Sequence, residues 1–179
     1  MAAANLAESA PRGVIRAGGL DRAEVVALLR EHLADMRRHT PPASIHALDL
    51  DALRAPGISF WSMWDGERLM GCGALKQLDP AHGEIKSMRT AQGYTRQGVA
   101  RRMLGHLMAE ARCRRYRRLS LETGSMAAFA PAHRLYAEAG FKRCGPFAGY
   151  GDDPNSVYLT LDIEPAAAVG ARGAAAAGV

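Results

Sequence analysis

Cysteine is scarce in this chain, and its spacing suits neither a disulfide framework nor a zinc site. The 179 residues include three cysteines, Cys72, Cys113 and Cys144, with no CxxC spacing among them. No stretch approaches the roughly 18 consecutive apolar residues of a membrane span, and the first residues lack a basic segment followed by a long apolar run. We therefore expect no signal peptide, no membrane anchor and a reducing, cytoplasmic location.

Metal-binding motifs are also missing. The chain has six histidines, but none of them forms an HExxH motif or another spacing typical of metal ligands. His82 and His133 stand singly in an expected turn and an expected helix, where a histidine is more often a solvated or hydrogen-bonded side chain. We predict no metal site.

The positive charge is modest but concentrated in one segment. The formal net charge is +5, and the eight arginines between Arg96 and Arg118 are accompanied by one acid, Glu110. Such a cluster favours an anionic ligand, which could be nucleic acid, an acidic membrane surface or a phosphorylated small molecule. Only Tyr116 interleaves the arginines and no helix-turn-helix pattern is present, so nucleic-acid binding is a third, less favoured interpretation and we expect no nucleic-acid partner. We expect no membrane partner either.

The chain reads as one domain between two low-complexity ends. Residues 1–12 are rich in alanine, residues 165–179 in alanine and glycine, and we predict that both are disordered. No repeat and no long Pro/Gly/Ser linker divides residues 13–164. This length is enough for a single hydrophobic core without disulfide or metal staples.

Hydrophobic periodicity within that domain predicts an α/β (α+β) fold with about seven strands and about four helices. Asp65-Gly66 between two apolar runs indicates a tight hairpin turn. Trp61 and Trp64 are an odd number of residues apart on one strand, so they should face opposite sides of the sheet, with one of them in the core. The expected strands are 14–17, 58–64, 68–77, 84–90, 119–123, 141–146 and 156–161, and the expected helices are 21–38, 48–53, 98–113 and 131–139.

The segment from residue 90 to residue 102 is the clearest candidate for ligand binding. A strand ends there, a Gly/polar loop follows, and a helix begins at Gly98. Unpaired N–H groups at a helix start, together with the helix dipole, bind phosphate. Arg96, Arg101 and Arg102 add permanent positive charge. The loop lacks GxxxxGK[ST] and a full GxGxxG, so it is neither a P-loop nor a Rossmann fingerprint.

At these residues the chain resembles the GNAT superfamily of N-acetyltransferases, in its small bacterial form. The family signature, Arg or Gln followed by two variable residues, Gly, one variable residue and Gly or Ala, is matched by the segment from Thr95 to Ala100, except that Thr95 replaces the Arg or Gln. A second signature is met by Ala132, Leu135-Tyr136 and Gly140-Phe141, although Phe129 stands where the family often has Asn. The resemblance covers about residues 13–163.

The resemblance implies a GNAT fold, which is a central, twisted, mixed but mostly antiparallel sheet flanked by helices. It also implies acetyl-CoA as co-substrate and acetyl transfer to an amine by direct attack in a ternary complex. The expected acceptor is a primary amine of a small or amino-acid-like molecule, and a homodimer is possible in this family. The implied acetyl-CoA contacts are Met88, Arg89, Thr90, Arg96, Gln97, Gly98, Val99, Ala100, Arg101, Phe129 and Tyr136.

The chemistry needs a base for the amine and an acid for the departing thiolate. The resemblance makes Glu84 the first candidate base, four residues before Met88 on the same expected strand, and Glu122 at the end of the next strand is the alternative. It makes Tyr136 the candidate acid and the Met88 N–H a donor to the oxyanion. Glu84 could equally be a structural carboxylate paired with Lys86.

The acceptor stays open at this point. The segment between Gly145 and Ser156 contains two aromatic residues and the acids Asp152 and Asp153. It could form one wall of the acceptor site and hold an ammonium group, although an Asp-Pro-Asn turn explains these residues equally well. A catalytically silent, CoA-binding module is a second interpretation, because Thr95 and Phe129 replace customary residues.

Overall fold

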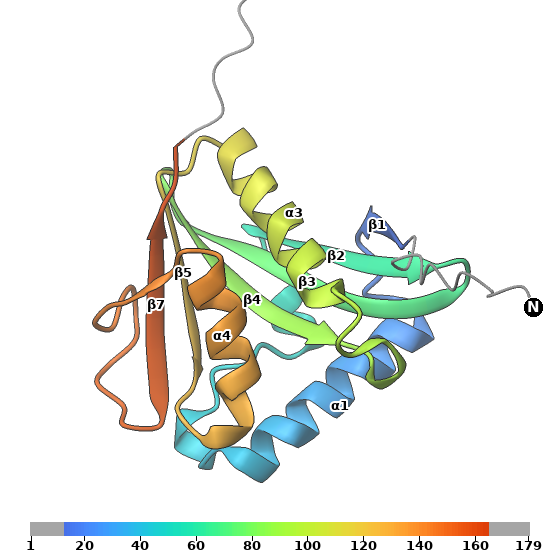
Figure 1. Cartoon of the computed structure of the whole chain (residues 1–179), viewed down its shortest axis with the longest axis horizontal. Coiled ribbons are helices and arrows are strands. Elements are labelled where there is room, and N and C mark those ends of the chain that lie inside the picture. The colour runs from blue at the N-terminus through green and yellow to red at the C-terminus, as the bar shows by residue number, and fades with distance from the viewer. Residues whose placement is uncertain (1–12, 165–179) are drawn as a thin grey trace, which may run out of the picture.

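One seven-stranded sheet forms the centre of the molecule. The computed structural model describes residues 13–164, so the two ends for which we predict disorder, 1–12 and 165–179, lie outside the described residues. The strand order is β1-β2-β3-β4-β5-β7-β6 (Figure 1). The strands are β1 (Val14–Ala17), β2 (Ile58–Asp65), β3 (Arg68–Asp79), β4 (His82–Thr90), β5 (Arg118–Gly124), β6 (Lys142–Arg143) and β7 (Ser156–Asp162).

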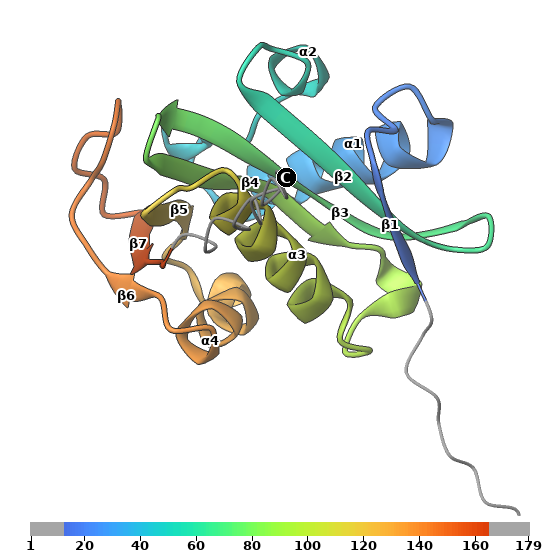
Figure 2. The same ribbon diagram turned by 90° about the horizontal axis from the view of Figure 1, so that it is seen from above.

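Helices cover both faces of this sheet. The helices α1 (Ala23–His39) and α2 (Leu50–Leu53) lie on one face, and α3 (Val99–Cys113) and α4 (Ala130–Glu138) lie on the other (Figure 2). All neighbouring strands pair antiparallel except β4 and β5, which pair parallel. The predicted mixed, mostly antiparallel sheet with about four helices is confirmed. No helix within residues 13–164 combines the length and apolarity that crossing a membrane requires.

Each face of the sheet has its own hydrophobic core, and the two tryptophans of β2 divide between them. Trp61 packs with the α3 residues Met103 and Leu107, whereas Trp64 packs with Val25 and other α1 residues. The prediction that they face opposite sides is confirmed. The expectation that only one is in the core was wrong, because both are almost fully buried.

Two local predictions differ from the structure. Asp65 pairs with Arg68 across the hairpin, so the two-residue turn consists of Gly66 and Glu67 and lies one residue later than Asp65-Gly66 predicts. Gly66 has a φ of 56°, which suits a first turn position that favours glycine. The predicted strand 141–146 is reduced to two residues in β6. Pro146 has no N–H to continue its ladder, and the chain from there to β7 is an aromatic-rich connection.

The parallel pair β4 and β5 opens along its length. The two strands are paired only from His82 to Glu84 on β4, opposite residues 118–120 of β5. Beyond this point they diverge, with α4 in front of the gap in Figure 1. The pairing of β4 with β3 is also irregular. Gly73 of β3 lies opposite two β4 residues, Ser87 and Met88, and Ser87 has a φ of 51°, as expected of a β-bulge.

Candidate functional site

A cavity of about 910 Å³ occupies the gap between β4 and β5. Residues from both faces of the sheet line it, so the cavity passes from the α1 face to the face covered by α3 and α4. Its walls come from α1, the segment before α2, the second half of β4, the loop before α3, the end of β5 and α4. The lining includes His32, Asp35, His46, Cys72, Lys86, Ser87, Met88, Arg89, Thr90, Thr95, Arg96, Gly98, Val99, Ala100, Arg101, Glu122, Phe129, Arg134, Tyr136 and Glu138.

The start of α3 forms one end of this cavity. Gly98 is the N-cap residue and adopts the left-handed conformation, with a φ of 79°, and no side chain caps this helix start. Arg96, two residues earlier, also has a positive φ of 60°. A Cβ at Gly98 would have nothing within 4 Å, so glycine is favoured here by backbone conformation. The first N–H groups of α3 and its dipole are therefore available to an anion.

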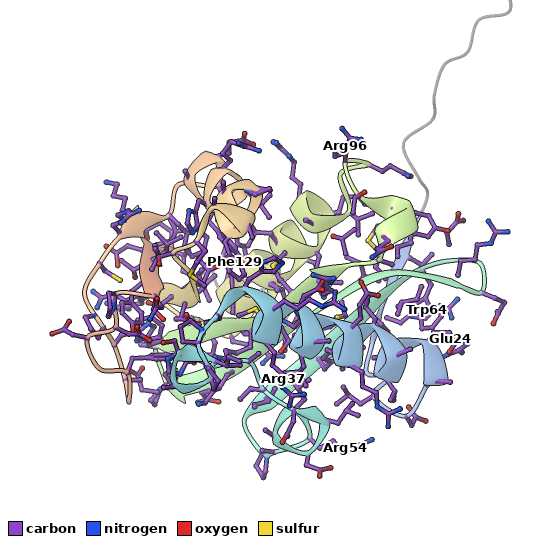
Figure 3. All side chains as sticks on the ribbon, turned by 90° about the horizontal axis from the view of Figure 1, so that it is seen from below. Glu24, Arg37, Arg54, Trp64, Arg96 and Phe129 are labelled. Atoms are coloured by element: carbon purple, nitrogen blue, oxygen red, sulfur yellow. The ribbon has the colours of Figure 1, made fainter. Side chains whose placement is uncertain are left out.

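Arginine side chains surround the same end. Arg96, Arg101 and Arg134 line it, together with one acid, Glu138. Arg101 Nη2 lies 2.5 Å from Glu138 Oε2, which leaves this end with more cations than carboxylates. Figure 3 shows Arg96 on the loop before α3, at the periphery of the molecule.

Tyr136 lines the cavity and lies next to Met88. Its hydroxyl is 3.7 Å from the Met88 Sδ atom, to which it donates. Burial raises the pKa of Tyr136, so the phenol keeps its proton at neutral pH and can act as a proton donor. Phe129 lines the cavity nearby, and its ring packs so closely on Gly124 that a Cβ there would lie 2.3 Å from the Phe129 Cε2 atom.

The two candidate bases have different surroundings. Glu84 is 1% exposed and is not among the residues that line the cavity. Its Oε1 accepts a hydrogen bond from the Tyr150 hydroxyl at 2.5 Å and lies 3.2 Å from Lys86 Nζ. The carboxylate of Glu84 is thus committed to a buried pair that joins β4 to the segment before β7.

Glu122 lines the cavity on the α1 side of the sheet. Its Oε1 accepts a hydrogen bond from Ser156 Oγ at 2.8 Å. Burial raises the pKa of Glu122, while the Ser156 bond and the charges of His46 and Lys86 act in the opposite direction. A carboxylate with a raised pKa is a stronger base than an ordinary glutamate.

Helix α1 contributes residues that the sequence analysis did not identify. His32 and Asp35 line the cavity, and Asp35 shares the guanidinium of Arg89 with Glu31, whose Oε1 is 2.8 Å from Arg89 Nη2. Lys86, which the sequence suggests only as a partner of Glu84, also lines the cavity. Polar residues that continue the apolar stripe of α1 were an available signal, because position 32 follows Leu28 at helical spacing.

Several predicted site residues lie elsewhere than expected. Gln97 does not line the cavity, and its amide donates to the Gly93 carbonyl at 2.9 Å. Asp152 and Asp153 are also absent from its lining. Asp153 accepts from the Asn155 N–H at 2.8 Å, as the turn interpretation expects. The other predicted contacts, together with Tyr136, line the cavity: Met88, Arg89, Thr90, Arg96, Gly98, Val99, Ala100, Arg101 and Phe129.

The cavity contains one thiol, and that thiol is unreactive. Cys72 is buried on β3, and burial raises its pKa to about 12, so almost none of it is thiolate at neutral pH. In the part of the chain that the structure describes, no three His, Cys, Asp or Glu side chains are grouped in a way that could hold a metal ion.

Sequence comparison finds close relatives of this chain among bacterial acetyltransferases. A model of the Acetyltransferase (GNAT) family matches residues 25–141. The uncharacterized N-acetyltransferase YsnE of Bacillus subtilis is 57% identical over 149 residues, which is 83% of this chain and 99% of that protein. The uncharacterized N-acetyltransferase YedL of Escherichia coli is 49% identical over 149 residues, covering 83% of this chain and 94% of that protein.

Structural comparison agrees on the fold. An acetyltransferase of Bacillus subtilis solved in complex with CoA superposes with a TM-score of 0.60 and 15% sequence identity, covering 85% of this chain and 99% of that chain. At this identity the likeness shows a shared sheet and helix arrangement.

Proposed function

The chain belongs to the GNAT acetyltransferase family and is an N-acetyltransferase, and on this premise we propose that it transfers the acetyl group of acetyl-CoA to a primary amine of a small or amino-acid-like molecule. One observation carries the proposal. The cavity between β4 and β5 joins the basic, uncapped start of α3 to Glu122 and Tyr136. Two substrates can therefore meet in it from opposite faces of the sheet.

The donor binds at the α3 end. The N–H groups at the helix start and the charges of Arg96 and Arg101 suit the pyrophosphate of acetyl-CoA. Thr95, which departs from the family signature, leaves this backbone arrangement in place, since the positive φ values belong to Arg96 and Gly98. On its β5 side, β4 has no paired strand after Glu84. The backbone of Met88 and its neighbours then lies along the path of the pantetheine arm.

Glu122 is the better placed of the two candidate bases. It faces the cavity, whereas Glu84 is occupied by Lys86 and Tyr150. A protonated amine loses two protons on becoming an amide. In the proposed reaction Glu122 takes the first, directly or through water, and passes it to solvent. The second replaces the proton that Tyr136 gives to the departing thiolate.

Transfer is direct, without a covalent acyl-enzyme. The carbon–nitrogen bond forms as the amine attacks the thioester carbonyl, and the carbon–sulfur bond then breaks. Cys72 is the thiol that lines the cavity, and its pKa of about 12 makes it a poor nucleophile at neutral pH.

Ligand-dependent thermal unfolding tests the donor site. A ligand at about 100 times its dissociation constant stabilises the folded state by roughly 2.7 kcal/mol, and for a chain of this length that raises Tm by roughly 5 to 11 °C. We expect this shift with CoA and acetyl-CoA and none with NAD. The release of the CoA thiol from acetyl-CoA in the presence of an amine then measures turnover. A missing shift would refute CoA binding, and a shift without turnover of any amine would favour the silent module.

A further inference from the structure

On the α1 side of the sheet, the charged groups that line the cavity or pair with its lining comprise four carboxylates and three cations: Glu31, Asp35, Glu84 and Glu122 against Arg38, Lys86 and Arg89. Asp35 and Glu122 line it as acids, and Lys86 and Arg89 line it as bases. Both cations already have acidic partners. Arg89 Nη2 bonds the carboxylates of Glu31 and Asp35, and Lys86 Nζ lies 3.2 Å from Glu84 Oε1.

Glu122 is the carboxylate left without a cation. Its hydrogen-bond donor is the neutral hydroxyl of Ser156, at 2.8 Å, and within residues 13–164 no Lys, Arg or His nitrogen lies within ion-pair distance of it. Lys86 Nζ donates to the Tyr150 hydroxyl and to the His46 carbonyl, and it lies 3.2 Å from Glu84 Oε1. The lysine is therefore not available to a carboxylate of the acceptor.

A half-buried histidine whose Nδ1 atom is buried gives a second, independent sign of a ligand at this end. His32 lines the cavity, and its Nδ1 is buried without a hydrogen-bond partner. Burial lowers the pKa of His32 to about 4, and the charge of Arg89 acts in the same direction. The imidazole is therefore neutral at pH 7 and adds no positive charge to this end.

The cavity is thus polarised along its length. Its α3 end has the arginines Arg96, Arg101 and Arg134 against Glu138, and its α1 end has one carboxylate without a paired cation, Glu122. A molecule with a carboxylate beside its amine would place a negative charge near that of Glu122, where no cation is free to offset it. An amine without that carboxylate meets no such repulsion, and its ammonium group is attracted by Glu122.

We propose that the acceptor is a cationic amine without a carboxylate next to its amino group, such as a diamine or an aryl-alkyl amine, rather than an α-amino acid. This inference rests on the proposed acetyl transfer and narrows its substrate class. Glu122 repels the carboxylate of the amino acid and attracts the ammonium group of the decarboxylated amine, while Asp35 keeps the Arg89 guanidinium from pairing with that carboxylate.

Matched pairs of amines that differ by one carboxylate provide the test. Cadaverine is compared with lysine, putrescine with ornithine, and tyramine with tyrosine. Thiol release from acetyl-CoA gives kcat/KM, and calorimetry with the CoA-bound protein gives affinity. We expect the amine of each pair to exceed its amino acid by about 10-fold or more in both measurements.

Two results would overturn the inference and leave CoA binding intact. One is equal or better binding and turnover of the amino acids. The other is a protein that shows the CoA-dependent rise in Tm but binds no amine of the panel. A failure of the proposed function is recognised separately, because then either the rise in Tm is absent or no compound of the panel, amine or amino acid, releases thiol from acetyl-CoA.

A charge-neutral variant tests the residues. In Asp35→Asn we expect the preference for cadaverine over lysine to shrink by about 3-fold or more, with the KM for acetyl-CoA unchanged. Asp162→Asn is the control, since Asp162 lies on β7, is exposed, pairs with Arg118 and does not line the cavity. An unaltered preference in Asp35→Asn would remove Asp35 from the acceptor site and overturn this part of the inference.

Discussion

Glu84 and Glu122 show how the surroundings of a carboxylate decide what it can do. Both come from strands that border the same gap. The charge of Glu84 is held by Lys86 and by the Tyr150 hydroxyl, so its loss would disturb the connection before β7. Glu122 faces the cavity with one neutral donor, Ser156. A base must be able to exchange protons with substrate, and only the second arrangement provides that.

Glu122→Gln and Glu84→Gln therefore differ in their effects on the pH profile. Because burial raises the pKa of Glu122, activity of the native enzyme falls as pH drops through that pKa and the base becomes protonated. We expect Glu122→Gln to lower kcat/KM by about 100-fold and to remove this acidic limb. Glu84→Gln should keep the limb. Rate measurements from pH 5 to 9 check this, and a limb lost in Glu84→Gln but kept in Glu122→Gln would assign the base to Glu84.

At the scale of elements, the backbone of α3 is conformationally constrained at the first glycine, Gly98, and not at the second, Gly105. Gly98 needs its left-handed conformation to begin the helix, whereas Gly105 lies within the helix with ordinary φ and nothing within 4 Å of an added Cβ. The same substitution should thus have opposite effects at the two positions.

Gly98→Ala should destabilise the protein by about 1 kcal/mol because alanine is strained at positive φ, and it should weaken CoA binding. Gly105→Ala should stabilise it by roughly 0.5 to 1 kcal/mol and leave CoA affinity unchanged. Thermal unfolding and CoA titration of both variants check this. Equal changes in stability would contradict the assigned role of Gly98.

Elements with strong periodicity were predictable from the sequence, and those defined by pairing were not. The apolar stripes of α1 and α3 and the meander β2-β3-β4 lie where the pattern places them. The extent of β6 depends on how far Pro146 and its neighbours can pair with β7, and the turn at Gly66 depends on the register of the hairpin. The local composition therefore predicts neither the length of β6 nor the position of this turn.

The residues of the candidate site were also predictable only in part: those that belong to sequence motifs were, and those that depend on long-range contacts were not. The loop at Gly98 and the position of Tyr136 come from motifs that the sequence displays. The choice between Glu84 and Glu122 depends on where β4 and β5 stop pairing, and that point follows from long-range contacts. The α1 residues Asp35 and His32 were detectable as polar residues on an apolar face, but their pairing with Arg89 was not.

For the molecule as a whole, the half-buried His32, which lines the cavity, makes the stability of the fold depend on pH in the acid range. Burial lowers its pKa from the usual 6.5 to about 4, so the unfolded chain binds a proton in that range that the folded chain does not. The stabilisation is complete above pH 6.5 and is lost progressively as pH falls toward 4. The loss is about 2 kcal/mol at pH 5, or roughly 4 to 8 °C in Tm.

His32→Gln should reduce the fall in Tm between pH 7 and pH 5 by that amount. His39→Gln is the control, since His39 is exposed at the end of α1. Calorimetric scans of the three proteins at both pH values measure the slopes. A native slope retained in His32→Gln would attribute the acid sensitivity to other groups.

The divergence of β4 from β5 has an evolutionary consequence. Because the gap opens through the sheet, the walls on its two sides belong to different parts of the chain. In the function proposed above, the start of α3 and α4 build the donor side, and α1, the segment around His46 and the end of β5 build the acceptor side. Gene duplicates of such a protein can exchange residues on one side and keep the other under selection. Related enzymes can in this way keep the same acyl donor while their acceptors share only the nitrogen atom that is acylated.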